Sequence, residues 1–453
     1  MFSKSKTYAS NYLAAIVQLT NIRKHCNADR LQISSVFNNN IITGLTAEVG
    51  QLYCYFPIEC AISKEFLSST NSYSDATLNK DTTVKGYFPS SGRVKVAKLR
   101  GEKSEGYIVP LSSLADFVKN VLKEDFIFDD SMIGVEFDTI GTHQLCRKYI
   151  PVNQRGAGLP NGRKTKGSIK KHMSKLVENQ FRLHYDTSPL KKNSHKVHPD
   201  DYIAISNKLH GTSFVVANVL IKKKLNLFQR VFKKLGADVV DTEYGMLYSS
   251  RCVIKNRDYV TVDDTMGFYG SDIWKIAADK IEPFLKAGVS VYGEIVGFTE
   301  SGAYIQKGFD YNCAPNTCAI YIYRMTYTSA TGDVFEFSHH QVAEWCKSHG
   351  FDMVPEYYHG KARDLFPDLS VDSMDLETWQ DQFLQRLMAH YLEKDCDMCV
   401  NPVPAEGVCL RLDAKSDFEV YKLKSFKFFL MESSALDKNE IDIETEQSQI
   451  FEE

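Results

Sequence analysis

The chain has 453 residues, of which 43% are hydrophobic and 25% charged, and its formal net charge is −3. This length predicts two or three domains, and the composition is that of an ordinary globular protein, which excludes disordered and fibrous chains. No stretch approaches the roughly 18 consecutive apolar residues that a membrane-spanning helix needs.

The N-terminus and the cysteines indicate the compartment. The opening segment MFSKSKTYASNYLAAIVQL has only a short apolar run and no small-residue cleavage site. The eleven cysteines follow no disulfide framework spacing. We therefore expect a cytoplasmic protein in a reducing environment, without a membrane partner.

Residues 1–150 show the pattern of a small β domain. The segments RLQISSVF, NIITGLTA, GQLYCYFPI, RVKVAKLRG and GYIVPL alternate as strands do, and one helical pattern lies near SSLADFVKNVLK. Short strands separated by turn signals are typical of a β-barrel.

Residues 151–200 differ in charge from the rest of the chain. Between 153 and 198 the sequence has eleven basic residues and only two acidic ones, Glu178 and Asp186. Gly and Pro crowd its first part, GAGLPNGRKTKG, which lacks the spacing of a phosphate-binding P-loop. We interpret this segment as a basic linker with a short helix near 168–180 that binds a nucleic-acid backbone; a solvated tether is the alternative.

Residues 201–431 read as a mixed α/β domain. DYIAIS, SFVVANVLI, LYSSRCVI, VSVYGEIVG, CAIYIYRMT, EGVCLRL and VYKLKSFKFF are strand-like, and SDIWKIAADKIEPFLKAG, HHQVAEWCKSHG and MDLETWQDQFLQRLMAHYLEK are helical. Residues 432–453 contain eight acidic residues and one lysine and are predicted to be a partly disordered acidic tail.

The stretch NKLHGTSF places Lys208 at the end of an apolar strand, where it would lie on the floor of a pocket. A lysine attacks phosphorus only as the free amine, so its pKa has to be lowered by burial or by nearby cations. Gly211 would let the backbone approach a ligand closely. Taken alone, a lysine at a strand end is usually a solvated charge.

Later strands supply further groups. Glu294 lies in VYGEIVG between two glycines, a pattern that indicates a bulky ligand against the strand. Tyr321 and Tyr323 lie on one strand face, where either could stack on a base or belong to the core. Glu406 precedes a buried-looking strand and needs a cation.

Lys422 and Lys424 share one strand face, as residues two apart do. Like charges so placed repel each other unless an anion lies between them, and phosphate is the obvious one; a solvated strand edge is the alternative.

Two segments are ambiguous. Cys396 and Cys399 form a lone C-x-x-C, and since structural zinc needs about four ligands we expect a reduced pair in a turn. The basic insertion KKKLNLFQRVFKKLG is either a nucleic-acid contact or a solvated helix, and the solvated helix is favoured.

Six motifs, KLHGTS, YSSR, VYGEIVG, IYIYRM, AEGVCLR and YKLKSFKFF, stand in the order of the nucleotidyltransferase motifs of covalent ligases and capping enzymes. A histidine in the first motif, followed by Gly-Thr, and the segment YIQKGFDY resemble the ATP-dependent RNA ligase 2 branch. DRLQISSV, GQLYCYFPIE, KLRGEKSEGYIVPL and FRLHYDTSPLKKN resemble the subset of that branch with an N-terminal OB-type domain. The chain departs from the branch at Asn207, often glutamate, and at Tyr323-Arg324, often Phe-Asp.

The resemblance implies an α+β fold. An OB-like β-barrel that binds nucleic acid would occupy residues 1–150, and a mixed α/β nucleotidyltransferase domain with ATP-grasp-like antiparallel sheets would occupy 201–431. It also implies an RNA ligase that joins 3′-OH and 5′-phosphate ends by way of a lysine–AMP and an adenylylated RNA end, in RNA repair. ATP and Mg²⁺ or Mn²⁺ would be the cofactors, and we expect a monomer.

The site residues follow from the same resemblance. The catalytic residues would be Lys208, His210, Lys422 and Lys424, with His210 near the phosphate or the RNA ends. Nucleotide binding would add Leu209, Arg251 on the ribose or the RNA phosphate, and Tyr323 on the adenine. Glu294 and Glu406 would hold the metal ion, partly through water, with Glu294 on the ribose as the alternative.

Three other functions compete with this one. A DNA nick ligase and a GTP-using capping guanylyltransferase belong to the same superfamily, but both usually carry their OB domain after the catalytic domain. A catalytically dead nucleic-acid-binding module would have no reason to keep Lys208, Glu294, Glu406, Lys422 and Lys424 together.

Overall fold

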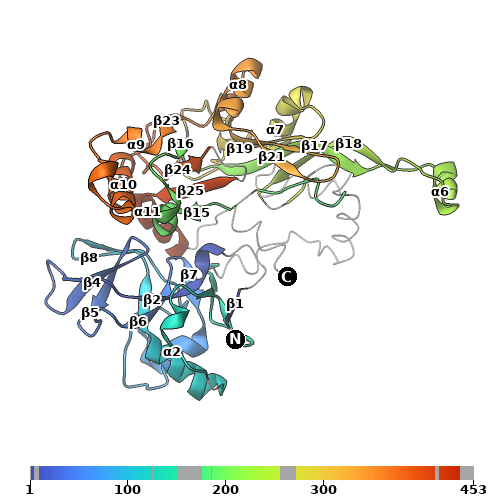
Figure 1. The fold of residues 1–453 in the computed structure, drawn as a ribbon. Helices are drawn as coiled ribbons and strands as arrows, with labels where there is room; N and C mark the ends of the chain where they lie inside the picture. The colour runs from blue at the N-terminus through green and yellow to red at the C-terminus, as the bar shows by residue number, and fades with distance from the viewer. Residues whose placement is uncertain are drawn as a thin grey trace. The chain divides into compact units, whose positions relative to one another are not determined.

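The computed structural model describes residues 2–4, 10–124, 126–151, 176–184, 186–251, 253–255, 272–413 and 418–438 (Figure 1). The chain forms two compact units. One comprises Met1–Arg155 and Phe429–Glu440, and the other comprises Gly156–Phe428 and Ile441–Glu453.

The first unit is built on an antiparallel sheet with the strand order β10-β6-β2-β11. Both of its faces are covered, so its central strands are apolar at nearly every position: in β2, Ala14 and Ile16 belong to one core and Ala15 and Val17 to another. The strands of this sheet are β2 (Ala14–Gln18), β6 (Leu52–Phe56), β10 (Tyr107–Pro110) and β11 (Glu136–Phe137).

Four smaller sheets complete the described part of this unit. They are β3 (Ile22–Lys24), β4 (Leu31–Val36) and β5 (Asn39–Gly44); β1 (Phe2–Ser3), β12 (Thr139–Ile140) and β13 (His143–Gln144); β7 (Cys60–Ile62) and β14 (Cys146–Lys148); and β8 (Ala97–Leu99) and β9 (Glu102–Ser104). The described strands therefore make separate sheets and no closed barrel, and the predicted OB-type barrel is not confirmed.

Two α-helices from the N-terminal segment pack on this unit. The helix predicted near SSLADFVKNVLK is present as α2 (Leu111–Phe117), and it continues as a π-helical turn over Val118–Leu122. The other is α1 (Lys64–Ser69), whose N-cap Ser63 accepts a hydrogen bond from the Phe66 amide. Short 3₁₀ turns lie at Ser10–Tyr12, Ala76–Leu78 and Asp130–Met132.

The helix α11 (Phe426–Asp437) crosses two of the predicted domain boundaries. From Phe429 onward it belongs to the first unit, although residues 429–431 are predicted to be part of the mixed α/β domain, and it extends into the segment predicted as a partly disordered tail. Its last turns are held by the buried Arg93. The guanidinium donates to the Ser433 carbonyl at 3.0 Å and to its hydroxyl at 2.5 Å, and lies 3.2 Å from the Asp437 carboxylate. Charge-assisted hydrogen bonds to a buried arginine order this part of the segment.

The second unit contains two larger sheets. One has the order β15-β25-β24-β16-β23, formed by β15 (Ser188–Pro189), β16 (Tyr202–Asn207), β23 (Glu356–Lys361), β24 (Gly407–Leu412) and β25 (Glu419–Lys424). The other has the order β18-β17-β19-β20-β21, with β22 on β20, formed by β17 (Thr212–Lys222), β18 (Thr242–Ser250), β19 (Val289–Gly297), β20 (Cys318–Thr328), β21 (Val334–Glu336) and β22 (Asp352–Met353). Pairing is antiparallel except for β15 with β25 and β20 with β22.

Helices cover these sheets. Trp274 and Ile281 of α7 (Ile273–Ile281) and Val342 of α8 (His339–His349) pack with the six-stranded sheet, and Trp379 and Phe383 of α10 (Leu376–Tyr391) pack with the five-stranded sheet. The remaining α-helices are α5 (Leu190–Asn193), α6 (Leu227–Lys234) and α9 (Ala362–Leu365), and 3₁₀ turns lie at Ser194–Lys196, Glu282–Phe284 and Val371–Ser373.

The predicted linker is shorter than its assigned range. Residues 152–175, which include GAGLPNGRKTKG and the start of the predicted helix, lie outside the described residues. Residues from Ser188 are part of the second unit, because β15 pairs with β25 through Ser188–Tyr421 and Pro189–Lys422. The sequence alone concealed this strand, since a two-residue strand has no periodicity.

Candidate active site

Lys208 lies where the chain passes from one sheet of the second unit to the other. The strand β16 ends at Asn207, β17 begins at Thr212, and the loop between them holds the sequence KLHG. The Lys208 amide donates to the Gly407 carbonyl at 3.0 Å, which fixes this loop beside the start of β24. The lysine is thereby held at the junction of the two sheets.

Lys208 and Lys424 share one carboxylate oxygen. The amines lie 2.7 Å and 3.1 Å from Glu406 Oε1, and the Glu406 side chain is only 4% exposed. Burial disfavours the charged carboxylate, but Lys208 and Lys424 together lower the pKa of Glu406 to about 2. The buried Glu406 carboxylate thus has the cation that it needs, in the form of the two motif lysines.

The state of Lys208 corrects one expectation. Burial by itself would lower its pKa, but the Glu406 carboxylate, together with Cys409 and Glu294, outweighs burial, and the pKa of Lys208 is raised above its usual range. The expected depression occurs at Lys422 instead, where burial, opposed by Asp186, leaves a pKa of about 8. In this arrangement Lys208 is protonated at neutral pH.

Glu294 closes the other side of the Lys208 loop. Its Oε1 accepts a hydrogen bond from the Gly211 amide and its Oε2 one from the Ser213 hydroxyl, both at 3.2 Å. A Cβ on Gly211 would lie 2.3 Å from the Ile295 carbonyl oxygen, and one on Gly293 would lie 2.5 Å from the Phe214 ring. These glycines therefore serve contacts inside the protein. That they also make room for a ligand stays a prediction.

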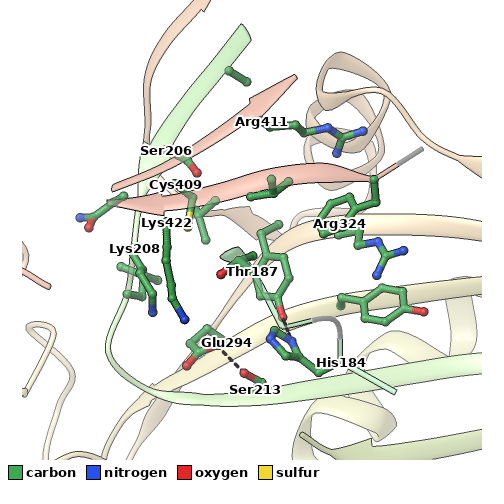
Figure 2. Close-up of a pocket in the computed structure, with 18 of the residues that line it drawn as sticks. His184, Thr187, Ser206, Lys208, Ser213, Glu294, Arg324, Cys409, Arg411 and Lys422 are labelled. Atoms are coloured by element: carbon green, nitrogen blue, oxygen red, sulfur yellow. Dashed lines mark hydrogen bonds between the residues drawn. The ribbon is translucent and has the colours of Figure 1, made fainter. Parts of the chain in front are cut away.

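A pocket with about 1010 Å³ of empty space, partly open to solvent, lies beside this loop. Figure 2 shows Lys208 and Lys422 turned toward the side on which Glu294 lies. Six of the predicted site residues line the pocket, namely Lys208, Leu209, Arg251, Glu294, Tyr323 and Lys422. Glu406, which contacts Lys208, and Lys424, which contacts Glu406, are not among the residues that line the pocket.

Tyr323 owes its place to a β-bulge. The pairing of β20 with β19 shifts between Tyr292–Arg324 and Gly293–Ile322, so Tyr323 is the extra residue. The bulge explains how the consecutive residues Tyr323 and Arg324 both line the pocket. The Tyr323 hydroxyl lies 2.8 Å from His184 Nδ1, whereas Tyr321 is not among the described residues that line the pocket.

We call the part of the pocket around Lys208, Lys422, Lys424, Glu294 and Glu406 the lysine end, and the part around Arg324 and Arg411 the arginine end. Figure 2 shows Lys208 and Lys422 on one side of the pocket and the two arginines on the other.

At the arginine end each cation has its own carboxylate. Arg324 makes a two-pronged contact with Glu336, with Nε 3.0 Å from Oε2, and its guanidinium lies 4.5 Å from the Tyr292 ring and 4.0 Å from the Phe418 ring. Arg411 Nε lies 3.0 Å from Asp413 Oδ1. Arg324, the departure from the Phe-Asp pattern, thus forms a fixed wall of the pocket.

The segment before β15 contributes groups that sequence analysis did not assign to the site. His184, Asp186 and Thr187 line the pocket, and Asp186 Oδ1 lies 2.5 Å from Arg251 Nη2. The similarity noted for FRLHYDTSPLKKN was the available signal. The lining also includes Ser213, Cys409, Arg411 and Phe418, which were not proposed as site residues.

His210 does not line the pocket. Its ring packs edge-on against Phe309 and Phe428, at centroid distances of 4.8 and 4.9 Å, and its Nδ1 lies 3.8 Å from Glu406 Oε2. The Tyr311 hydroxyl accepts a hydrogen bond of 2.6 Å from its amide. This geometry fits a residue that positions Glu406.

The carboxylates fit a metal ion that keeps most of its water. Glu406 Oε2 is buried and accepts no hydrogen bond from the described residues, which leaves a lone pair available at the lysine end. No group of three or more His, Cys, Asp or Glu side chains in the described part of the chain could form a cage by itself. Mg²⁺ is characteristically held by one or two carboxylates, waters and substrate phosphates.

Cys396 and Cys399 flank a turn at Asp397–Met398, and both are free thiols. Their mutual hydrogen bond lowers the pKa of Cys396 to about 7. The described residues around them include no metal-binding group of the required size.

No protein-family model and no curated protein sequence matches the chain. Solved structures do match it, among them Naegleria gruberi RNA ligase with ATP and Mn, in a variant with one lysine replaced by alanine, at a TM-score of 0.55 and 13% identity over 94% of this chain and 99% of that one.

The same enzyme with pyrophosphate matches at a TM-score of 0.53 and 14% identity, over 93% of this chain and 99% of that one. The form with AMP and Mn, in a lysine-to-methionine variant, matches at 0.51 and 14%, over 92% and 98%. At these identities the likeness shows the fold alone: over most of its length the chain has the fold of an RNA ligase.

Proposed function

We propose that this protein is an ATP-dependent RNA ligase that joins 3′-OH and 5′-phosphate ends through a lysine–AMP intermediate on Lys208. The observation that carries the proposal is the lysine end of the pocket, where Lys208 and Lys424 share one oxygen of Glu406 and Lys422 lies within electrostatic reach. This concentration of cations at a pocket suits an anion such as the α-phosphate of ATP. The RNA ligase fold and the ATP, AMP and pyrophosphate in the similar structures support it.

In the first step the Lys208 amine attacks the α-phosphorus of ATP. The new N–P bond replaces the bond to the bridging oxygen, pyrophosphate leaves with its electron pair, and the amine loses a proton. Lys422 and Lys424 hold the negative oxygens during this transfer. Because Glu406 stabilises the protonated lysine, release of the free amine requires that this carboxylate be neutralised by other charge.

In the later steps AMP passes from Lys208 to a 5′-phosphate of RNA, and a 3′-hydroxyl then displaces it. Tyr323 stacks on the adenine with its hydroxyl fixed by His184, and Arg251, oriented by Asp186, contacts the ribose or the RNA phosphate. Glu294 is fixed by Gly211 and Ser213 and binds the metal hydration shell or the ribose.

The metal would be held at Glu406 and, through water, at Glu294. A bound Mg²⁺ or Mn²⁺ supplies positive charge to the phosphate oxygens and to the Glu406 carboxylate. The Oε2 atom of Glu406, which accepts no hydrogen bond from the described residues, supports this assignment.

We assign RNA-backbone binding to the first unit, as an OB-type domain, and to the basic segment that follows it. Contacts to phosphates release counterions, so this binding weakens steeply as salt rises. We further propose that the protein acts in RNA repair, as a monomer, in the cytoplasm.

The test is a labelling experiment. The protein is incubated with α-labelled ATP or GTP and a divalent metal and is then run on a denaturing gel. Label from ATP on the wild type and on Lys223→Ala, but not on Lys208→Ala, is expected; Lys223 is a matched control because it is exposed and lies outside the pocket.

Label from GTP alone would replace the proposal with a capping guanylyltransferase. No label from either nucleotide would leave a nucleic-acid-binding module. Sealing of nicked duplexes with RNA or DNA 3′-hydroxyl ends then separates an RNA ligase from a DNA nick ligase.

A further inference from the structure

The helix α6 has no part in the function proposed above. The strands β17 and β18 remain paired as far as Lys222 and Thr242, and the chain between them forms this helix at the tip of the hairpin (Figure 1). Asn226 caps the helix: its side chain accepts from the Gln229 amide at 2.8 Å, and the Gln229 side chain accepts from the Asn226 amide at 3.0 Å. The sequence thus defines the start of a helix far along an extended hairpin.

One face of α6 is apolar and exposed to solvent. Successive helical residues turn by about 100°, so five apolar side chains fall on an arc of about 140°. Their exposed fractions are 78% for Leu227, 77% for Phe228, 54% for Val231, 54% for Phe232 and 76% for Leu235. An isolated exposed leucine is ordinary, but five such side chains on one short helix mark an interaction surface.

The rest of the helix and the strand before it are basic. Residues 222–235 contain six cations and no acidic residue, namely Lys222, Lys223, Lys224, Arg230, Lys233 and Lys234. Lys233 is paired with Asp241, and the other lysines of the set are exposed. On the helix, Gln229, Arg230, Lys233 and Lys234 occupy the arc opposite the apolar one.

We propose that α6 is a peripheral membrane anchor that inserts its apolar face into the surface of an anionic lipid bilayer. A basic amphipathic helix with Phe and Leu on one face is the type of element that lies in the interface plane, with its cations on lipid headgroups. The expectation of no membrane partner was based on membrane spans. No described helix is long and apolar enough to cross a bilayer, so the contact is with the surface.

Two other occupants fit the surface less well. RNA would neutralise the cations but would leave the Leu and Val side chains in water, since a phosphate backbone offers them no apolar contact. A second copy of the chain would cover the apolar face but would bring its own six cations against the first six. An anionic bilayer offers apolar depth and negative charge together.

The hairpin separates this anchor from the pocket. β17 runs from Thr212, four residues after Lys208, to Lys222, a length of about 36 Å for its 11 residues at about 3.3 Å per residue. A bilayer at α6 would therefore leave the pocket open to substrate. Changes at the tip are expected to leave nucleotidyl transfer unchanged.

The test is co-sedimentation of the full chain, without nucleotide or RNA, with vesicles of phosphatidylcholine or of phosphatidylcholine mixed with phosphatidylserine. The wild type is expected to sediment with the mixed vesicles only. Phe228→Ser/Phe232→Ser is expected to weaken this binding at least about 10-fold, because each phenylalanine loses apolar burial. Removing charge by Lys223→Gln/Lys224→Gln is expected to weaken it by about 5-fold per lysine.

Phe335→Ser is the matched control, because Phe335 is 57% exposed on β21, and it is expected to bind like the wild type. Failure of the wild type to sediment, or equal sedimentation of the double phenylalanine variant, would overturn the proposal. So would an effect of that variant on RNA filter binding or on self-association in place of lipid binding. Labelling of Lys208 is assayed separately, so failure of the anchor and failure of the ligase activity are distinguishable.

Discussion

The two ends of the pocket hold their cations differently. At the arginine end Arg324 is paired with Glu336 and Arg411 with Asp413, so each buried charge has a partner of its own. At the lysine end Lys208 and Lys424 converge on one oxygen of Glu406, and the neighbouring Lys422 has a depressed pKa. One-to-one pairing neutralises each buried charge, as a structural part of the pocket requires. Cations that share one carboxylate keep excess positive charge, so an anionic ligand would stabilise them.

The largest expected effect separates the two ends by activity. Lys208→Ala removes the proposed nucleophile and is expected to reduce adenylylation by more than about 10⁴-fold, since the proposed phosphoramide forms on this amine. Its melting temperature should stay near that of the wild type, because Lys424 still pairs with Glu406. Labelling measures the activity and a thermal melt on the same preparation measures the stability. A variant that loses both its activity and its folded structure would contradict the proposed difference between the two ends of the pocket.

At the arginine end a substitution is expected to reduce stability rather than activity. Arg324→Met leaves Glu336 as an unpaired buried carboxylate and should destabilise the protein by about 3 to 5 kcal/mol. The double variant Arg324→Met/Glu336→Leu should recover much of that loss, because it removes both charges. Urea unfolding measures all three proteins, and a single variant as stable as the wild type would show that the arginine end is not a structural wall.

The dependence of stability on acidic pH tests the role of Glu406 at the lysine end. A carboxylate whose pKa is lowered to about 2 from an ordinary value of 4.5 contributes stability that is fully present above pH 4.5 and is lost as pH falls toward 2. That contribution is about 3 kcal/mol. Glu406→Gln should therefore flatten the stability profile between these pH values, and an unchanged profile would contradict the lysine cluster.

The smallest effect concerns Lys422. With a pKa of about 8 it is a cation at neutral pH and loses its charge above pH 8. Affinity for a non-reactive ATP analogue should therefore fall by about 10-fold above that pH, as one phosphate contact weakens. In Lys422→Arg the charge persists above pH 8, so the fall in affinity should disappear. Calorimetric titration at several pH values measures the affinity of both proteins. An equal fall in both would show that Lys422 is not the titrating contact.

Much of the site could be predicted because its residues lie within strands or directly beside them. Lys208, Glu294, Tyr323 and Lys422 each lie on or next to a strand of readable pattern, and the structure gathers them in one pocket. The roles assigned to them stay predictions.

Other features depended on contacts between distant segments. The bulge at Tyr323, the wall made by Arg324 and Phe418, and the pairing of Asp186 with Arg251 join residues that share no local pattern. The ordering of α11 by Arg93 likewise depends on a buried guanidinium about 340 residues away from Ser433, so the composition of the tail suggested disorder. The raised pKa of Lys208 could not be read from the sequence, because it depends on its 2.7 Å contact with Glu406.

The identity of the modified lysine tests the central claim most directly. The protein is incubated with ATP and Mg²⁺, digested under conditions that preserve phosphoramides, and the peptides are sequenced by mass spectrometry. The account predicts AMP on Lys208 alone, although Lys422 has the lower pKa in the ligand-free arrangement. AMP on Lys422 or Lys424, or on no lysine at all, would contradict it.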